Sequence, residues 1–252
     1  GSVQPEERTA PTEQGLTGTE VGGNEAHGNY EKGLSLQLKG HLKPAVACYQ
    51  KALALDPHHA DAYNNMGVAY QELGDIAGAL KYLKRAVSLR PDYIEAYNNL
   101  GNAFQHAGDL DMAVSCYKRV LKLNPDLSQA HNNLGNVHLQ KGAITEAMRS
   151  YKKGVALDPK NAEAHCNMGN ALQYMGRCNE ALEWYKKSIA LNADNPAAYN
   201  NMGAALQNVG RLEEAFSCQQ EAIRRQPGNA DAYNNMGRTL KDQGKIPEAI
   251  RC

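Results

Sequence analysis

The sequence predicts an all-α solenoid of tandem helical hairpins, because three columns of small residues recur along its 252 residues at one spacing. Apolar residues between these columns recur at three and four, as in Tyr63, Met66 and Tyr70, which is the period of a helix face. Two columns are glycine and one is alanine, each repeating every 34 residues: Gly33, Gly67, Gly101, Gly135, Gly169, Gly203 and Gly237; Gly40, Gly74, Gly108, Gly142, Gly176, Gly210 and Gly244; Ala45, Ala79, Ala113, Ala147, Ala181, Ala215 and Ala249.

This period divides residues 26–252 into seven units, and we number the places within each unit from its first residue. The first glycine, at place eight, removes a side chain where two helices approach closely. The second glycine, followed by an N-cap such as Asp75 or Asp109, predicts a short turn into a second helix. A proline closes most units after that helix. The units start at 26, 60, 94, 128, 162, 196 and 230, and the closing prolines are Pro57, Pro91, Pro125, Pro159 and Pro227.

The two ends of the chain depart from this pattern. Residues 1–25 are rich in Gly, Thr, Glu and Pro, so we expect a disordered tail. Its leading Gly1 and Ser2 are typical of an expression-vector remnant. The seventh unit stops at Cys252 inside its second helix, so we expect a fragment of a longer protein with an exposed apolar flank, able to pair with another copy.

Charge and hydropathy exclude several classes of function. Lys+Arg and Asp+Glu are balanced at 27 each, which gives no global attraction to nucleic acid or to an anionic membrane. The apolar runs are too short for a membrane helix, and no signal-peptide core is present near the start. We therefore expect an intracellular protein, cytoplasmic or nuclear or both.

The 34-residue unit resembles the tetratricopeptide repeat, whose pattern runs aromatic-x2-L-G-x2-Y, A-x3-F and P. The resemblance covers residues 26–252, and it implies a right-handed superhelical solenoid of tandem hairpins. It also implies that places two, five, six, nine, twelve and thirteen of the first helices face a concave groove. Unit five departs from the pattern, with Ala193 at the proline place, and we expect an altered local angle there. The third unit fills the pattern with Tyr97, Leu100, Gly101, Phe104, Ala113, Tyr117 and Pro125.

Two adjacent asparagines recur at places five and six, as in AYNNMG and AYNNLG. A primary carboxamide offers both a donor and an acceptor, like a peptide bond, so such a column could hold an extended main chain regardless of its side chains. We therefore predict a peptide-binding asparagine ladder. Its sixth-place members are Asn65, Asn99, Asn133, Asn167, Asn201 and Asn235, its ninth-place members are Asn102, Asn136 and Asn170, and its fifth-place members include Asn64, Asn98 and Asn132, with Asn200 and Asn234 in the same column.

An alternative remains open for these asparagines. They could bond backbone groups of their own or the neighbouring unit and serve only the order of the repeats. With two per unit, one could be structural and the other could bind ligand. Acidic residues at place two, such as Asp61 and Glu163, suggest a preference for neutral or basic peptides, or simply complement the helix dipole.

The sixth-place column, in segments such as ADAYNNMGRTLKDQGKIPEAI at 230–250, is similar to the tetratricopeptide arm of the O-linked N-acetylglucosamine transferases. That resemblance implies a substrate-recognition arm whose concave asparagines hold polypeptide, with the catalytic domain lying outside these 252 residues. The Lys and Arg clamp of carboxylate-binding tetratricopeptide proteins is missing. The alternative function is a free-standing scaffold that assembles a multiprotein complex or associates with itself.

No catalytic, metal or cofactor site is predicted. Cys48, Cys116, Cys218 and Cys252 share one place, but stacked units would hold their sulfurs too far apart for a metal. His131 and His165 occupy the aromatic packing place of their units, so we interpret them as packing residues. The chain is therefore expected not to be an enzyme by itself.

Overall fold

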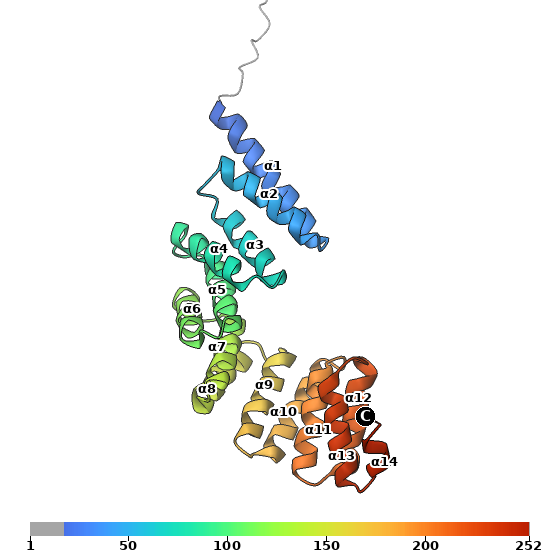
Figure 1. The fold of residues 1–252 in the computed structure, drawn as a ribbon. Coiled ribbons are helices and arrows are strands. Elements are labelled where there is room, and N and C mark those ends of the chain that lie inside the picture. Colours follow the sequence, from blue (N-terminus) through green and yellow to red (C-terminus); the bar gives the residue numbers. More distant parts are fainter. Residues whose placement is uncertain (1–17, 252) are drawn as a thin grey trace, which may run out of the picture. The chain divides into compact units, whose positions relative to one another are not determined.

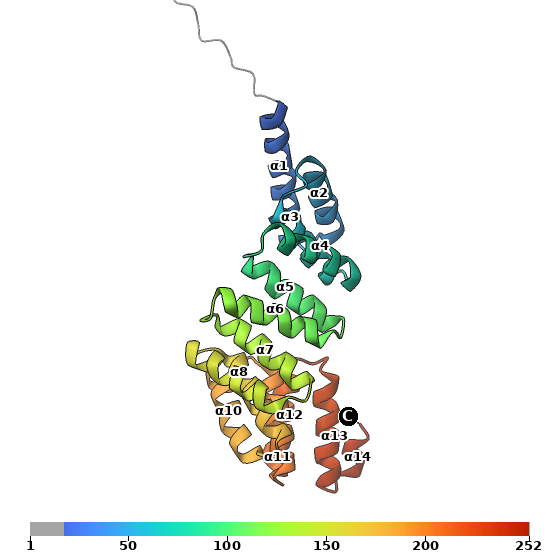
Figure 2. The same ribbon diagram turned by 90° about the vertical axis from the view of Figure 1, so that its left-hand side faces the viewer.

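The computed structural model describes residues 18–251, and every regular element among them is a helix. The all-α class and the tandem hairpins are therefore confirmed. The chain divides into two compact parts, an amino-terminal part of residues 1–93 and a carboxy-terminal part of residues 94–252. Consecutive helices pack against one another within each part, as the ribbon shows from two sides (Figures 1 and 2).

Each hairpin consists of two successive helices, so α1 and α2 form hairpin one and α13 and α14 form hairpin seven. The amino-terminal part contains α1 (Gly18–Leu38), α2 (Leu42–Leu55), α3 (Ala60–Glu72) and α4 (Ile76–Leu89). The carboxy-terminal part contains α5 (Ile94–His106), α6 (Leu110–Leu123), α7 (Ser128–Gln140), α8 (Ile144–Leu157), α9 (Ala162–Tyr174), α10 (Cys178–Leu191), α11 (Pro196–Asn208), α12 (Leu212–Arg225), α13 (Ala230–Asp242) and α14 (Ile246–Ala249).

The turn inside each hairpin depends on the second glycine column. Gly74 and Gly108 have φ of 82° and 79°, in the left-handed region that side chains other than hydrogen disfavour. The next residue then caps the second helix, because the Asp75 carboxylate accepts from the Gly78 amide at 2.8 Å. Asp109 accepts from the Met112 amide at 3.1 Å in the same way. The predicted turn and N-caps are thus present.

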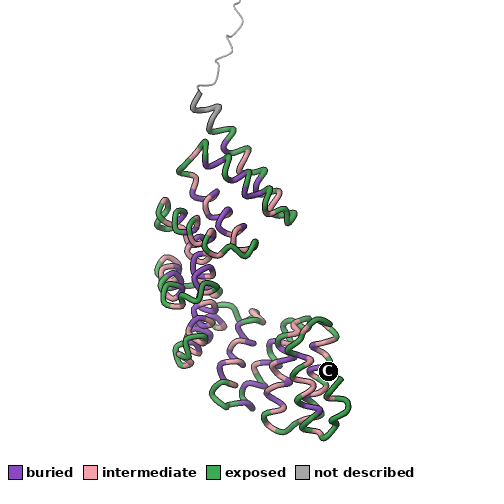
Figure 3. Tube along the Cα trace, in the orientation of Figure 1, coloured by how far each residue is buried: buried purple, intermediate pink, exposed green. Residues whose placement is uncertain are grey.

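The first glycine column allows the two helices of a hairpin to approach. A methyl group added to Gly135 or Gly169 would lie 2.5 Å from the ring of Tyr151 or Tyr185 on the second helix. These tyrosines are fully buried, and the alanine column beside them is also fully buried from hairpin one to hairpin six. Buried and exposed residues alternate along the helices accordingly (Figure 3). The core of hairpins one, three, four and five is therefore a tyrosine ring packed over a glycine, and Leu83 and Gln219 take that position in hairpins two and six.

Helix α1 begins at Gly18, eight residues before the predicted start of the first unit at residue 26. The expectation of a disordered tail therefore does not hold for residues 18–25, and residues 1–17 lie outside the described part of the chain. A helix held by packing against its neighbour lengthens at little cost, since each added residue gains one backbone hydrogen bond. No proline lies between residue 18 and the packed segment to stop it.

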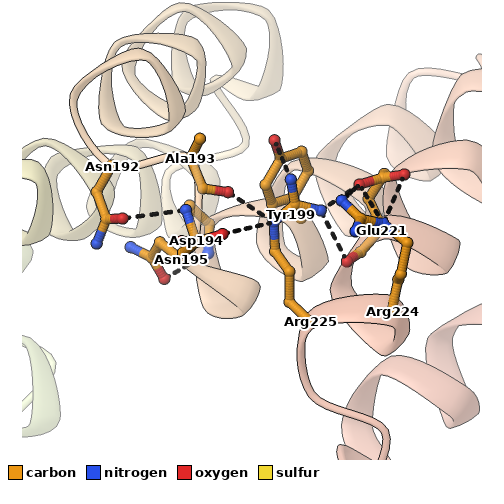
Figure 4. A network of polar contacts seen from close by, with 9 residues as sticks. Asn192, Ala193, Asp194, Asn195, Tyr199, Glu221, Arg224 and Arg225 are labelled. Atoms are coloured by element: carbon orange, nitrogen blue, oxygen red, sulfur yellow. Dashed lines mark hydrogen bonds and ion pairs between the residues drawn. The ribbon is translucent and has the colours of Figure 1, made fainter.

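Hairpin five lacks the closing proline, and an arginine from the next hairpin occupies the junction (Figure 4). Arg225 donates from Nε to the Ala193 carbonyl at 2.6 Å and from Nη2 to the Tyr199 hydroxyl at 3.1 Å. Its guanidinium also lies over the Tyr199 ring, 4.1 Å from the centroid, and pairs with Glu221. In hairpins four and five, His131 and His165 instead donate to the equivalent proline carbonyls.

Candidate peptide-binding face

The first helices of neighbouring hairpins contact one another directly. In the carboxy-terminal part α7 contacts α9, α9 contacts α11 and α11 contacts α13, and in the amino-terminal part α1 contacts α3. Among the described helices, no second helix makes comparable contact with the second helix of the next hairpin. The first helices are therefore the closer-spaced layer, and their side chains at places six, nine and twelve share one face.

The sixth-place asparagines are half-buried. Side-chain amides that reach back to the preceding hairpin include those of Asn65, Asn133, Asn167, Asn201 and Asn235. Asn133 Nδ2 donates to Asn98 Oδ1 at 3.1 Å, and Asn167 Nδ2 donates to Asn132 Oδ1 at 3.1 Å. Two further hydrogen bonds follow the same pattern, from Asn235 Nδ2 to Asn200 Oδ1 at 3.0 Å and from Asn65 Nδ2 to the Tyr30 hydroxyl at 3.1 Å.

Three of the fifth-place asparagines lie deeper than their sixth-place neighbours, whereas Asn234 of the last hairpin is exposed. Asn64 and Asn132 are 0% and 2% exposed, and Asn200 is also buried, whereas Asn98 is half-buried. A side chain with so little exposed surface does not line an open face, so Asn64 and Asn132 do not lie where direct contact with a peptide requires. Asn132 also donates to Glu163 Oε1 at 3.1 Å, which joins its hairpin to the next one. The expectation that the whole fifth-place column faces the groove is therefore wrong.

In units two, four and six, the fifth-place asparagine is buried and the sixth-place asparagine is half-buried. Between hairpins one and two, three and four, four and five, and six and seven, the fifth residue of one and the sixth residue of the next form a side-chain hydrogen bond. The alternative left open by the sequence invokes bonds to backbone groups, and the observed inter-repeat bonds join side chains instead. Each of these bonds uses one amino hydrogen of the sixth-place residue. It therefore fixes the orientation of the amide without using its whole hydrogen-bonding capacity.

The ninth-place asparagines are held from behind by the buried tyrosines of the second helix. The Tyr117, Tyr151 and Tyr185 hydroxyls donate to Oδ1 of Asn102, Asn136 and Asn170 at 2.6, 2.8 and 2.9 Å. Burial raises the pKa of all three phenols, so they remain protonated donors. Sequence reasoning missed this link, although each unit with asparagine at place nine has tyrosine at place 24.

A hollow of about 490 Å³ lies on this face in the carboxy-terminal part. We call it the amide hollow, and its lining comes only from first helices: Leu139 of α7, Asn170, Gln173 and Tyr174 of α9, and Asn201 and Asn208 of α11. It therefore brings together sixth-, ninth-, twelfth- and thirteenth-place residues. No charged side chain is part of this lining.

The acidic residues at place two take part in contacts within the chain. Asp61 accepts a bidentate pair of hydrogen bonds from Arg90 at 3.0 and 2.8 Å, and this arginine holds the carboxyl pKa below its usual value. Glu163 accepts from Asn132. These two carboxylates therefore have partners in the chain and are poor candidates for a peptide-binding role.

The cysteines show no activated thiol among the described residues. Cys48 and Cys116 are buried, Cys218 is half-buried, and Cys252 lies outside the described residues. Burial raises the pKa of the Cys166 and Cys218 thiols to about 11, the opposite of what a nucleophile requires. Within residues 18–251, no cluster of three or more potential metal-ligating His, Cys, Asp or Glu side chains occurs. None of the helices described has the length and apolar character that a membrane span demands.

Tandem hairpins with a polar face along their first helices define a helical-repeat protein of the interaction type. A tetratricopeptide repeat family profile matches residues 58–126 and 194–252, and a second profile, described as TPR repeat, matches residues 33–74, 135–176 and 169–210. The chain belongs to the tetratricopeptide repeat family. No curated protein sequence matched it.

Several solved structures share the fold. A tetratricopeptide repeat protein from Parabacteroides merdae superposes with a TM-score of 0.77 at 18% identity, covering 90% of each chain. The Cut9-Hcn1 hetero-tetramer of the APC/C gives 0.75 at 16% identity, covering 86% of this chain and 43% of that one. YrrB, described as a TPR protein with an unusual peptide-binding site, gives 0.54 at 21% identity, covering 73% of this chain and 95% of its own. Identities this low establish the fold and nothing finer.

Proposed function

We propose that the array binds an extended polypeptide segment through the side-chain amides at places six and nine. The observation that carries this proposal is the half-exposed sixth-place column, whose amides are oriented by hydrogen bonds to the preceding hairpin. The proposed rungs are Asn99, Asn133, Asn167, Asn201 and Asn235 with Asn102, Asn136 and Asn170 in the carboxy-terminal part, and Asn65 in the amino-terminal part.

Main-chain recognition follows from the chemistry of the rungs. A carboxamide matches the donor and acceptor of a peptide group, and it does not discriminate among side chains. Packed helices lie about 8–10 Å apart, and an extended chain advances about 3.3 Å per residue, so one rung meets about every third residue. The array therefore selects an extended segment more than a particular sequence.

The fifth-place asparagines act in this proposal as positioning residues. Asn98 and Asn132 accept the hydrogen bonds that orient Asn133 and Asn167. Asn64 is buried beside Asn65 and donates to its Oδ1 at 3.1 Å. Their contribution to binding is therefore indirect, through the orientation of the exposed amides.

Backbone methylation of a bound peptide tests the proposal without changing the protein. An array of immobilised 15-residue peptides of random sequence identifies a strong binder, which is then resynthesised with alternate backbone nitrogens methylated. Methylation removes main-chain donors and retains every side chain, so we expect affinity to fall by about tenfold or more. Equal affinity of the methylated and unmethylated peptides would refute recognition of the main chain.

The finer version of this function is a substrate-recognition arm of an O-linked N-acetylglucosamine transferase-like protein acting in the cytoplasm or nucleus. The support is the unbroken sixth-place asparagine column in units two to seven. The coding sequence beyond residue 252 provides the test. A sugar-nucleotide-binding α/β region is the expected finding, and an unrelated domain there would overturn this version.

The alternative is a scaffold that assembles a complex or associates with itself through its last hairpin. Ile246 and Ile250 of that hairpin are exposed, and a hollow of about 360 Å³ lies beside them, bounded also by Tyr233. Light scattering of the wild type and of the Ile250→Glu variant distinguishes the two functions. A dimer that the substitution dissociates favours the scaffold, and a monomer in both favours the arm.

A further inference from the structure

The amide hollow has a donor side and an acceptor side, which the hydrogen bonds around it determine. On α9, Asn170 Oδ1 accepts from Asn201 Nδ2 at 2.9 Å. The Tyr185 hydroxyl lies 2.9 Å from Asn170 Oδ1 and 2.8 Å from Gln173 Oε1, and its single proton serves one of these two oxygens at a time. This oxygen of Asn170 therefore faces donors of the chain itself. The group that Asn170 still offers to the hollow is its amino group, a donor.

The α11 side offers the opposite chemistry. Asn201 Nδ2 donates to Asn170 Oδ1 and lies 3.9 Å from the Cys166 sulfur, so both of its amino hydrogens have acceptors. The amino group of Asn208 lies 3.9 Å from the Cys178 sulfur. Each of these two residues therefore retains its carbonyl oxygen as an acceptor toward the hollow.

Gln173 of α9 is also part of the lining, and its Oε1 lies 2.8 Å from the Tyr185 hydroxyl. The rest of the lining is apolar or aromatic. Leu139 of α7 closes one side, and the Tyr174 ring is 73% exposed, which is unusual for a large side chain in this fold. Together they offer a surface for a short aliphatic stem. No lysine, arginine, aspartate or glutamate lines the hollow to pair with a charged ligand group.

We infer that the amide hollow is a subsite for the primary carboxamide of a glutamine or asparagine side chain carried by the bound segment. The ligand oxygen accepts from Asn170 Nδ2, its amino group donates to Asn201 Oδ1, and its stem packs against Leu139 and Tyr174. This inference rests on the proposed function, because the segment must first lie along the first helices. It adds a local side-chain preference to recognition that is otherwise independent of sequence.

Other ligand groups match the hollow less well. A carboxylate has no donor for the Asn201 and Asn208 oxygens, and an ammonium has no acceptor for the Asn170 amino group. Either charge would also lose its water without an opposite charge in return. A hydroxyl carries its donor and its acceptor on one atom, so it cannot span two separate amides as a carboxamide does.

Peptide pools test the preference. Each pool contains immobilised 15-residue peptides that are random except for one fixed residue type at every third position, either Gln, Glu, Lys or Leu. The whole 252-residue chain is used as the probe. We expect the Gln pool to bind about tenfold more tightly than the Glu and Lys pools, because each charged group leaves polar groups unpaired.

The Asn170→Asp variant converts the donor that faces the hollow into an acceptor. Aspartate keeps a carboxylate oxygen to accept from Tyr185 and Asn201, but it replaces the amino group with a negative oxygen. The expected result is a shift in preference from the Gln pool to the Lys pool. Asn136→Asp is the matched control, because Asn136 also accepts from a tyrosine hydroxyl but is not part of the hollow.

A second variant keeps the test valid if Asn170→Asp does not fold. Tyr174→Ala removes an exposed ring and should leave the melting temperature unchanged while reducing the Gln preference about threefold. Equal binding of all four pools by the wild type would overturn the subsite and leave the proposed function intact. Absence of binding to every pool would overturn both, and an unaltered preference in both variants would overturn the subsite alone.

Discussion

Hairpins three to five and hairpin six fill the same place of the second helix with different side chains. Tyr117, Tyr151 and Tyr185 each pass over a glycine and donate to an asparagine on the first helix. Gln219 of hairpin six is also fully buried, but it donates to Thr239 Oγ1 of the next hairpin at 2.9 Å. Its Oε1 has no hydrogen-bond partner among the described residues.

In hairpins two to six, the core side chain at place 24 and the side chain at place nine of the polar face change together. Where tyrosine is absent at place 24, the ninth place is apolar, as with Ala204 in hairpin six and Val68 opposite Leu83 in hairpin two. A buried hydroxyl requires an acceptor, and the ninth-place asparagine provides it in hairpins three to five, whereas Tyr49 of hairpin one donates to Gln37 at place twelve. The asparagines at place nine therefore have a structural reason as well as a proposed ligand role.

Adding a methyl group at the place-eight glycine should produce the largest difference in stability between hairpins with tyrosine at place 24 and hairpin six. In Gly135→Ala the new methyl meets the buried Tyr151 ring at 2.5 Å, so we expect a loss of about 2 kcal/mol of stability. In Gly203→Ala the new methyl meets Gln219 Cγ at 3.0 Å and the Ala215 carbonyl oxygen at 3.2 Å, which are milder contacts, and the helix gains propensity, so the net loss should be smaller, about 1 kcal/mol. Urea denaturation compares the two. Equal losses would show that the tyrosine does not restrict this position.

Removal of a tyrosine hydroxyl should have the next largest effect. Tyr151→Phe deprives Asn136 of its donor, and we expect a loss of about 1 kcal/mol. The double variant Tyr151→Phe with Asn136→Ala removes both the donor and its acceptor and places alanine at place nine, as in hairpin six, so it should recover part of that loss. A double-mutant cycle by thermal denaturation measures the coupling, and strict additivity would contradict the link.

Gln219 of hairpin six and Thr239 of hairpin seven form a buried polar pair, and apolar replacements of both should raise stability. Gln219→Leu with Thr239→Val replaces a buried bond and an unpaired oxygen with apolar groups, and we expect a gain of up to about 1 kcal/mol. Gln219→Leu alone should be close to neutral, because it removes the unpaired oxygen but leaves Thr239 without its partner. A loss above about 2 kcal/mol in the double variant, measured by denaturation, would contradict this interpretation.

The smallest effect concerns hairpin two, which has Leu83 at place 24 and an ion pair between Arg90 and Asp61. The pKa of Asp61 is lowered in the folded state, so the pair stabilises the fold above the ordinary aspartate value of 3.8 and loses this contribution as pH falls through the lowered pKa. Both side chains are partly exposed, so the contribution should be below about 1 kcal/mol. The melting temperatures of wild type and Arg90→Gln should therefore converge at low pH, and a constant difference would contradict the assignment.

The spacing of the small residues was sufficient to predict the hairpins. Gly74 and Asp75 specify a turn and a cap by local chemistry alone, so a single sequence contains that information. The partners of the asparagines could not be derived in the same way, since Asn133 and Asn98 are 35 residues apart and meet only when the hairpins stack. The helical state of residues 18–25 was also missed, because composition does not report how far a packed helix extends.

The most direct test of the central claim compares two triple variants that break the same three hydrogen bonds. Asn133, Asn167 and Asn235 are changed to alanine in the rung variant, and Asn98, Asn132 and Asn200 are changed to alanine in the partner variant. Both should lose stability, while the affinity for a 15-residue peptide selected from the array, measured by fluorescence anisotropy at a temperature where both remain folded, should fall much further in the rung variant. Wild-type affinity in the rung variant, or an equal loss in the partner variant, would contradict binding by the sixth-place amides.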